Sequence, residues 1–226
     1  MKPHGPFPQR LPALLLTLFI LSACSTTPTS PPVPTPTAPP KRTDDACAIF
    51  SEKKEWYPLA KKSFRKWGAP LHVMLAIMHQ ESRFQHDAIP PKGRIMGVIP
   101  WGRASSAYGY SQALDGTWDW YREKTGNWGA DRDDFGDAID FMGWYIDQSH
   151  QMLGISKWDT YNQYLAYHEG QQGYKKKTFQ KKAWLIDVSR KVDRNAARYE
   201  KQLAACESQL RKEEGSSGKG GDWWPF

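Results

Sequence analysis

The chain has 226 residues, of which 39% are hydrophobic and 13% aromatic, including 11 tryptophans. This is enough apolar material for one domain with a buried core. The formal net charge is +7, concentrated in part in the lysines at 175–177 and 181–182. These lysines are not arranged as in a nucleic-acid-binding module, so we expect a solvated basic face and no nucleic-acid partner.

Residues 1–23 have the pattern of a signal peptide. Lys2 and Arg10 form a positive n-region, residues 11–21 form an apolar h-region, and Ser22-Ala23 supplies the small residues of a cleavage site. The apolar run is about half as long as a bilayer-spanning helix. We therefore exclude the segment from the folded domain and expect export from the cytoplasm.

The four residues Leu21-Ser22-Ala23-Cys24 resemble the lipobox of a bacterial lipoprotein. The resemblance implies cleavage before Cys24, acylation of that cysteine and anchoring in a membrane. Ser25 follows the cysteine, and in sorted lipoproteins this points to the periplasmic face of the outer membrane. The alternative is an ordinary secreted protein with a chance cysteine. Residues 24–43 are rich in Pro, Thr and Ser, which predicts an extended tether of up to roughly 60 Å.

Two cysteines remain in the mature chain, Cys47 and Cys206, near the two ends of the expected domain. In an oxidising compartment they predict one disulfide, the alternative being two free thiols. The sequence has no CxxC pair and no His/Cys cluster at metal-ligand spacing. We expect neither a metal ion nor a cofactor.

Residues 44–214 form the expected domain, which is predicted to be all-α, and residues 215–226 form a flexible aromatic tail. Apolar residues at three- and four-residue steps predict its helices. Residues 87–108 contain several prolines and glycines and are expected to form a long irregular loop, a type that is often functional. The helices are expected at 52–67, 71–84, 116–124, 133–152, 158–168 and 183–213.

The expected helix at 71–84 carries the most informative acidic residue, Glu81. The spacing of its apolar residues predicts one buried face, and Glu81 falls near the C-terminal end. The helix dipole and apolar neighbours both favour the neutral carboxyl there. A general acid needs this property near pH 7, although a solvated surface glutamate is the simpler alternative.

Three segments follow in order along the chain. They are HQESRF with Glu81 and Ser82, SAYGYSQALDGTW with Gly109, Tyr110 and Gln112, and YLAYHEG with Tyr164, Tyr167, His168 and Gly170. Together they resemble the lysozyme-like lytic transglycosylases of the soluble-transglycosylase type. That family has an E-S helix end, a G-L-M-Q segment and an A-Y-N-x-G segment. The resemblance covers about residues 56–174 and implies a lysozyme-like helical fold with a substrate cleft.

By this resemblance, Glu81 is the single catalytic acid and base in cleavage of the MurNAc–GlcNAc β-1,4 bond of peptidoglycan, leaving 1,6-anhydromuramic ends. Tyr167 is expected to form a hydrogen bond near the catalytic carboxyl, and Ser82 to orient the site. The partner is therefore the peptidoglycan glycan strand. The residues expected at the substrate are Ser82, Gly109, Tyr110, Gln112, Tyr167 and His168.

The chain departs from the family pattern at Tyr110-Ser111, where Leu-Met is usual, and at His168, which replaces an Asn. Two alternatives therefore remain: a hydrolytic muramidase of the same fold, or a non-catalytic peptidoglycan-binding lipoprotein. A hydrolase would use a second carboxylate within about 5–9.5 Å of the acid. The candidates for it are Asp87, Asp115, Asp119 and Glu169. The aromatic candidates for sugar stacking, for which core packing is the alternative, are Trp101, Tyr108, Trp118, Trp120 and Trp144.

Overall fold

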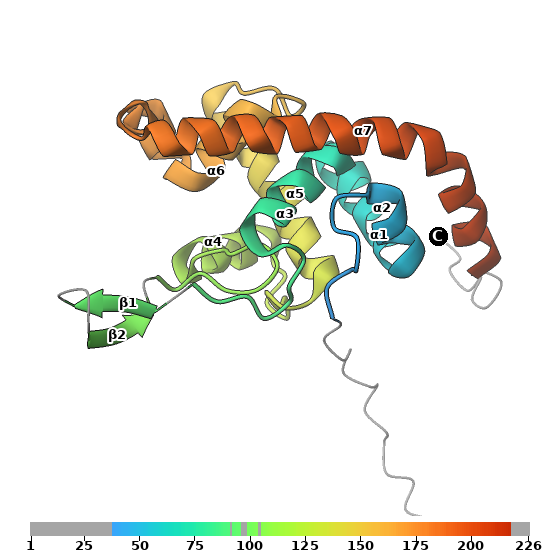
Figure 1. The fold of residues 1–226 in the computed structure, drawn as a ribbon, viewed down its shortest axis with the longest axis horizontal. Helices are drawn as coiled ribbons and strands as arrows, with labels where there is room; N and C mark the ends of the chain where they lie inside the picture. The colour runs from blue at the N-terminus through green and yellow to red at the C-terminus, as the bar shows by residue number, and fades with distance from the viewer. Residues whose placement is uncertain (1–37, 91, 96–98, 104, 218–226) are drawn as a thin grey trace, which may run out of the picture. The chain divides into compact units, whose positions relative to one another are not determined.

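The computed structural model describes residues 38–90, 92–95, 99–103 and 105–217, with backbone only for 92–95, 99–103 and 214–217. These residues belong to one compact unit, Pro34–Phe226. The expected signal peptide, Cys24, most of the tether and most of the aromatic tail lie outside the described residues. Helices dominate the described part of the chain, as the sequence predicts (Figure 1). They are α1 (Ala46–Glu52), α2 (Trp56–Trp67), α3 (Leu71–Ser82), α4 (Asp115–Thr125), α5 (Phe135–Leu153), α6 (Thr160–Lys175) and α7 (Ala183–Ser217).

The helix expected at 52–67 begins later than predicted, because α1 and α2 are separate helices joined by a turn at 53–55. Asp45 ends the preceding loop and caps α1, its Oδ1 accepting a hydrogen bond from the Ala48 N–H at 3.0 Å. Pro58 lies in the first turn of α2, where a missing N–H costs no helical hydrogen bond. Pro58 therefore does not kink the helix.

Helix α3 is buried on every side, whereas the sequence predicts one buried face. Six consecutive residues, 73–78, are inaccessible to solvent. An apolar helix surrounded by other helices has no polar face, so the periodicity of its apolar residues does not reveal how much of its surface is buried. The helix ends at Arg83 and Phe84, which both have positive φ angles of 52° and 63°. Phe84 is fully buried, and its ring packs against Trp56 and His79, so the end of α3 is fixed in the core.

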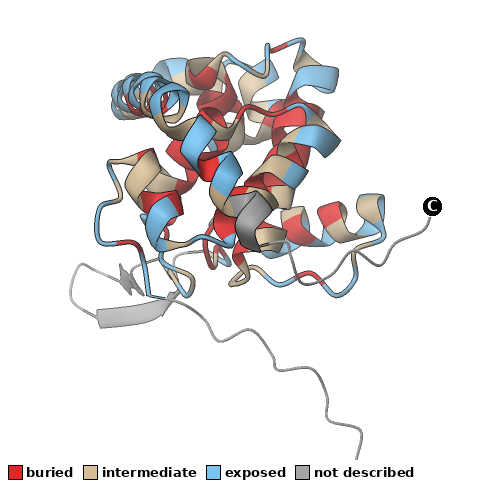
Figure 2. Ribbon diagram, turned by 90° about the vertical axis from the view of Figure 1, so that its right-hand side faces the viewer, coloured by how far each residue is buried: buried red, intermediate tan, exposed pale blue. Residues whose placement is uncertain are grey.

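Helix α7 is the longest element and lies across both α3 and α6 (Figure 1). It also packs against α1, to which the predicted Cys47–Cys206 disulfide joins it. The two Cα atoms are 6.1 Å apart, and the bond closes a loop spanning 159 residues. In the chain-entropy model a loop of this length is worth about 5 kcal/mol. Figure 2 shows the buried residues gathered on the facing sides of the helices.

Helix α6 extends to Lys175, seven residues beyond the expected end at His168. Gly170 interrupts it with non-helical angles, φ 70° and ψ 159°, and the chain then resumes a helical course. A left-handed φ of this kind is readily available to glycine. A short 3₁₀ helix, η1 (Thr178–Lys181), connects α6 to α7.

The segment 87–108 contains a small antiparallel hairpin, where the sequence predicts irregular structure. Strand β1 (Lys92–Ile95) pairs with β2 (Ile99–Arg103), with Gly93 opposite Trp101 and Ile95 opposite Ile99. Strands this short that contain Gly and Pro show no alternation of apolar and polar residues, so the pattern gave no signal. The all-α class holds, with the hairpin as a local addition.

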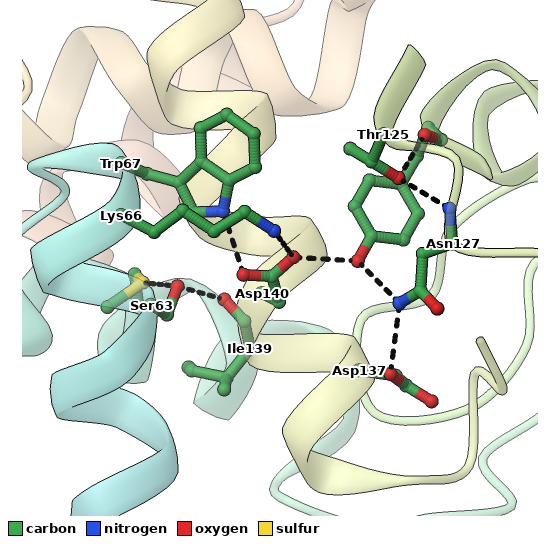
Figure 3. A network of polar contacts seen from close by, with 10 residues as sticks. Ser63, Lys66, Trp67, Thr125, Asn127, Asp137, Ile139 and Asp140 are labelled. Carbon is green, nitrogen blue, oxygen red and sulfur yellow. Dashed lines mark hydrogen bonds and ion pairs between the residues drawn. The ribbon is translucent and has the colours of Figure 1, made fainter. Parts of the chain in front are cut away.

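A polar network around Asp140 joins α2, α4 and α5 (Figure 3). The Asp140 carboxylate accepts hydrogen bonds from Trp67 Nε1 at 2.8 Å, from Lys66 Nζ at 2.9 Å and from the Tyr121 hydroxyl at 2.8 Å. A carboxylate with three donors is well satisfied and fixes the three helices that carry them. No helix within the described ranges combines the length and the apolar character needed to span a bilayer.

The close approach of α5 to α2 depends on Gly143. A Cβ at this position would lie 2.4 Å from Ser63 Oγ and 2.8 Å from Trp67 Cδ1. Ser63 Oγ is held there by a 2.8 Å hydrogen bond to the Ile139 carbonyl (Figure 3). We therefore expect Gly143→Ala to lower the free energy of unfolding by about 1–3 kcal/mol, measured by chemical denaturation. Gly116→Ala in α4, where a Cβ meets nothing within 4 Å, is the matched control and should be neutral or slightly stabilising. Equal effects of the two substitutions would contradict this account of the interface.

Candidate active site

A cleft of about 430 Å³ lies at the end of α3, and Glu81 is in its wall. Helices α4, α5 and α6 and the loop at 105–114 supply most of the other lining residues. Five residues singled out from the sequence meet here: Glu81, Gln112, Tyr167, His168 and the candidate second carboxylate Glu169. Further lining residues include Ser105, Ala113, Thr117, Phe141, Tyr145 and Gly170.

The Glu81 carboxyl is largely removed from solvent. Its Oε1 is buried and has no hydrogen-bond partner among the described residues. Burial raises the pKa of Glu81 from its ordinary value of 4.5 to about 7, and a hydrogen bond with the Tyr164 hydroxyl opposes this rise. The carboxyl can therefore hold or release a proton close to neutral pH, as the position of Glu81 in the sequence suggested.

Two tyrosines interact with the carboxyl and a third lines the same cleft, and burial raises the pKa of each hydroxyl well above 10. They are Tyr164, Tyr167 and Tyr145. The Tyr167 hydroxyl donates to the Ser111 carbonyl at 2.5 Å, so it hydrogen-bonds beside Glu81 and not to it. Tyr145 donates to Gln171 Oε1 at 3.2 Å. All three stay protonated at neutral pH, which leaves Glu81 as the group in this cluster that titrates near 7.

The loop at 105–114 is held by a set of short contacts around Gly109 and Gln112. Gly109 has a φ of 74°, and a Cβ there would lie 2.1 Å from the Arg132 carbonyl oxygen. Gln112 Nε2 donates to the carbonyls of Ala88 and Gly109, at 2.8 and 2.9 Å. The Arg132 guanidinium contacts Asp115 at 2.8 Å and the Ala113 carbonyl at 2.9 Å. Position 109 therefore requires glycine, because the Arg132 backbone lies too close to leave room for a Cβ atom.

Three of the residues expected at the substrate do not line the cleft. Tyr110 is buried in the core against Trp56 and Phe135, and its backbone N–H bonds to the Arg132 carbonyl. Ser82 is buried, and its hydroxyl donates to the Met78 carbonyl at 3.3 Å. Gly109 packs against the Arg132 backbone and so determines the course of the loop at 105–114. These residues support the cleft wall, and an aromatic ring at position 110 fills the core where a leucine is usual in the pattern.

Of the four candidates for a second carboxylate, Glu169 lines the cleft and the other three do not. Asp87 bonds to Gln85, Asp115 to Arg132, and Asp119 to Arg122. Burial alone would raise the pKa of Glu169, but hydrogen bonds from Lys182, Thr178 and His168 outweigh it and lower the pKa to about 2. Oε1 contacts Lys182 Nζ at 2.7 Å and His168 Nδ1 at 3.1 Å, and Oε2 accepts from the Thr178 hydroxyl.

Among the described residues, no group of three or more His, Cys, Asp or Glu side chains is placed to hold a metal ion. Tyr145 and Tyr164 are residues of the site to which sequence reasoning gave no role. Tyr145 belongs to the apolar stripe of the helix expected at 133–152, which predicts core packing, and Tyr164 stands in the third motif without an assigned role. Only the fold brings the Tyr164 hydroxyl to Glu81 and Tyr145 to the cleft.

The sequence profile of a family described as "Transglycosylase SLT domain" matches residues 12–206. The chain belongs to this family. It is therefore a peptidoglycan lytic transglycosylase with a lysozyme-like helical domain, as the three motifs predicted. No individual curated protein matches the chain.

The raised pKa of Glu81 makes the stability of this transglycosylase depend on pH. Its folded pKa of about 7 exceeds the unfolded value of 4.5, so its stabilising contribution is complete below pH 4.5 and is lost as the pH rises through 7. Glu81→Gln removes this loss. We expect the variant to be more stable than wild type at pH 8 by on the order of 3 kcal/mol, and similar at pH 4.5.

Denaturant unfolding at a series of pH values measures this difference. Glu123→Gln, which replaces an exposed carboxylate on α4, is the matched control and should follow wild type. Equal stabilities of wild type and Glu81→Gln at pH 8 would show that the carboxyl is solvated.

Proposed function

We propose that Glu81 acts as the single acid and base that cleaves the MurNAc–GlcNAc β-1,4 bond and closes a 1,6-anhydromuramic ring. The observation that carries this proposal is the burial of its carboxyl at the cleft, with a pKa of about 7. A group with this pKa is protonated in about half of the molecules at neutral pH and is basic once it has given up the proton.

In the first step the Glu81 carboxyl donates its proton to the glycosidic oxygen. The bond between C1 of MurNAc and that oxygen breaks, and an oxocarbenium-like centre develops at C1. In the second step the Glu81 carboxylate takes the proton of the muramic C6 hydroxyl, and O6 bonds to C1. The proton has returned to Glu81, and no water is consumed.

The state of Glu169 supports an internal nucleophile over a hydrolytic water. A general base or a nucleophile needs an oxygen that can reach water or C1. Both oxygens of Glu169 are engaged by Lys182, His168 and Thr178. An attack by the C6 hydroxyl needs no second carboxylate, so the cleft is suited to it.

We assign the sugar contacts to Gln112, Tyr167 and His168, which line the cleft beside Glu81. Gln112 Nε2 is used within the loop, so its Oε1 is the atom offered to a sugar hydroxyl. Ser82, Gly109 and Tyr110 act indirectly by fixing the end of α3 and the loop.

We further propose that the protein is a lipoprotein anchored through Cys24 at the periplasmic face of the outer membrane. The support is the lipobox-like sequence and the Ser at position 25. The tether at 24–43 would let the domain reach the glycan layer up to roughly 60 Å from the membrane. Metabolic labelling with a fatty acid, lost in Cys24→Ala, tests the anchor.

The experiment that tests the reaction is mass spectrometry of purified peptidoglycan digested by the full chain in mild detergent. We expect anhydro-muropeptides from wild type and from the control Glu123→Gln, and none from Glu81→Gln, which removes the proton donor but keeps the side-chain shape. A pH profile of kcat/KM for wild type should fall as the pH rises through about 7, because the acid form is lost.

Two other outcomes would overturn the proposal. Products with reducing ends would show that the cleft directs water to C1, as in a muramidase. Binding of peptidoglycan without products at any pH would show that the cleft only holds the glycan. A melting curve of Glu81→Gln like that of wild type at pH 5 ensures that loss of product is not loss of fold.

A further inference from the structure

One exposed tryptophan lies next to the cleft. Three tryptophans among the described residues are more than half exposed, Trp128, Trp158 and Trp184. Trp128 contacts Arg122, and Trp158 contacts His72, neither of which lines the cleft. Trp184 is 55% exposed and meets the ring of His168, a cleft residue, edge-on with centroids 5.1 Å apart.

Close to Trp184 in the sequence, a partly exposed lysine forms an ion pair with a buried carboxylate. Glu169 follows His168, its side chain is only 3% exposed, and it contacts Lys182 Nζ at 2.7 Å. Lys182 lies two residues before Trp184 at the start of α7. Thr178 in η1 donates to the other oxygen of the same carboxylate. A buried carboxylate that is paired and hydrogen-bonded in this way holds its partners firmly.

These groups lie at the cleft edge beside the interruption of α6 at Gly170. His168, Glu169 and Gly170 line the cleft one after another, and the backbone leaves the helical course at Gly170. The ion pair connects this edge of α6 to the start of α7. The tryptophan is therefore held at the rim of the cleft by its neighbours in the fold and is not a loosely attached surface residue.

The cleft is too small for a polymer. Its volume of about 430 Å³ lies at the lower end of the range for small-molecule sites. A glycan strand that is bound at Glu81 must continue across the neighbouring surface. Large aromatic side chains are usually buried, and an exposed one that is fixed beside a cleft indicates a ligand with an apolar face. A pyranose ring has such a face in its axial C–H groups.

We propose that Trp184 is the stacking platform of an additional glycan subsite at the rim of the cleft, beyond His168, with the Glu169–Lys182 ion pair as the device that positions it. The proposal rests on the proposed function, in which the strand occupies the cleft. Its occupant is a sugar ring of the same strand. Trp184 was not among the aromatic candidates from the sequence, because an isolated tryptophan at a helix start gives no pattern.

Binding of glycan strands tests the subsite without turnover. The background for all variants is the full chain carrying Glu81→Gln, in mild detergent, so that bound strands are not cleaved. The ligands are glycan strands from which the peptides have been removed. Adding Trp184→Ala should weaken binding about tenfold, the loss typical of a stacked tryptophan, and Trp184→Tyr should retain most of it. Adding Trp128→Ala, a tryptophan of similar exposure away from the cleft, should have no effect.

Kinetics of the active chain separate positioning from folding. Lys182→Met should raise KM for long strands several-fold, because it removes the ion pair that positions the rim. Lys182→Arg should restore KM, since it keeps the ion pair. Lys181→Met, at the exposed neighbouring position, is the control.

Equal binding of the Trp184→Ala and Trp128→Ala chains would overturn the proposal, even if Glu81 proves to be the catalytic acid. A loss of affinity in Trp184→Ala that is seen only with peptide-bearing strands would also overturn the proposal. The rim of the cleft would then bind the peptide stems, for which the exposed lysines at 175–177 offer charge. If wild type gave no turnover, the proposed function would fail, and the binding comparison would still decide the subsite.

Discussion

Exclusion of water from the Glu81 carboxyl is the constraint on which the rest of this structure depends. A carboxyl group at a helix end normally faces solvent, whereas the Oε1 atom of Glu81 is buried, although the residue as a whole is half-exposed at the cleft. Phe84 closes the end of the helix from within the core. The tyrosines at 145, 164 and 167 complete the surroundings with hydroxyls that stay protonated. The proton affinity of Glu81 is thus a property of the whole helical packing.

The surrounding elements hold the residues around Glu81 in place, while the cleft on one side stays open to the glycan strand. The Asp140 network fixes α4 and α5 against α2, and the disulfide fixes α1 against α7. Helix α7 covers α3, and Lys182, the residue just before α7, reaches the cleft edge through Glu169. Preorganised groups of this kind need little rearrangement when charge develops in the reaction.

The sequence predicted most helices, the disulfide and the three motifs, since periodicity and caps are local signals. It did not predict the environment of Glu81, because Tyr145 comes from an apolar stripe and Tyr164 from a motif that assigns it no role, and both reach the site only after folding. The hairpin at 92–103 was missed since its strands contain Gly and Pro. The Gly170 kink and the Glu169–Lys182 pair were also missed, because a left-handed glycine and a contact across thirteen residues leave no periodic trace.

The central claim is that burial sets the proton affinity of Glu81, and a direct titration tests it. Wild type labelled with ¹³C at the glutamate carboxyl carbons is followed by NMR from pH 3 to 9, and Glu81→Gln identifies the resonance by its absence. We expect one glutamate resonance that titrates with a midpoint near 7 and is missing from the Glu81→Gln spectrum. A Glu81 midpoint near the ordinary value of 4.5 would contradict it, because the carboxyl would then be ionised at neutral pH and could not serve as the acid.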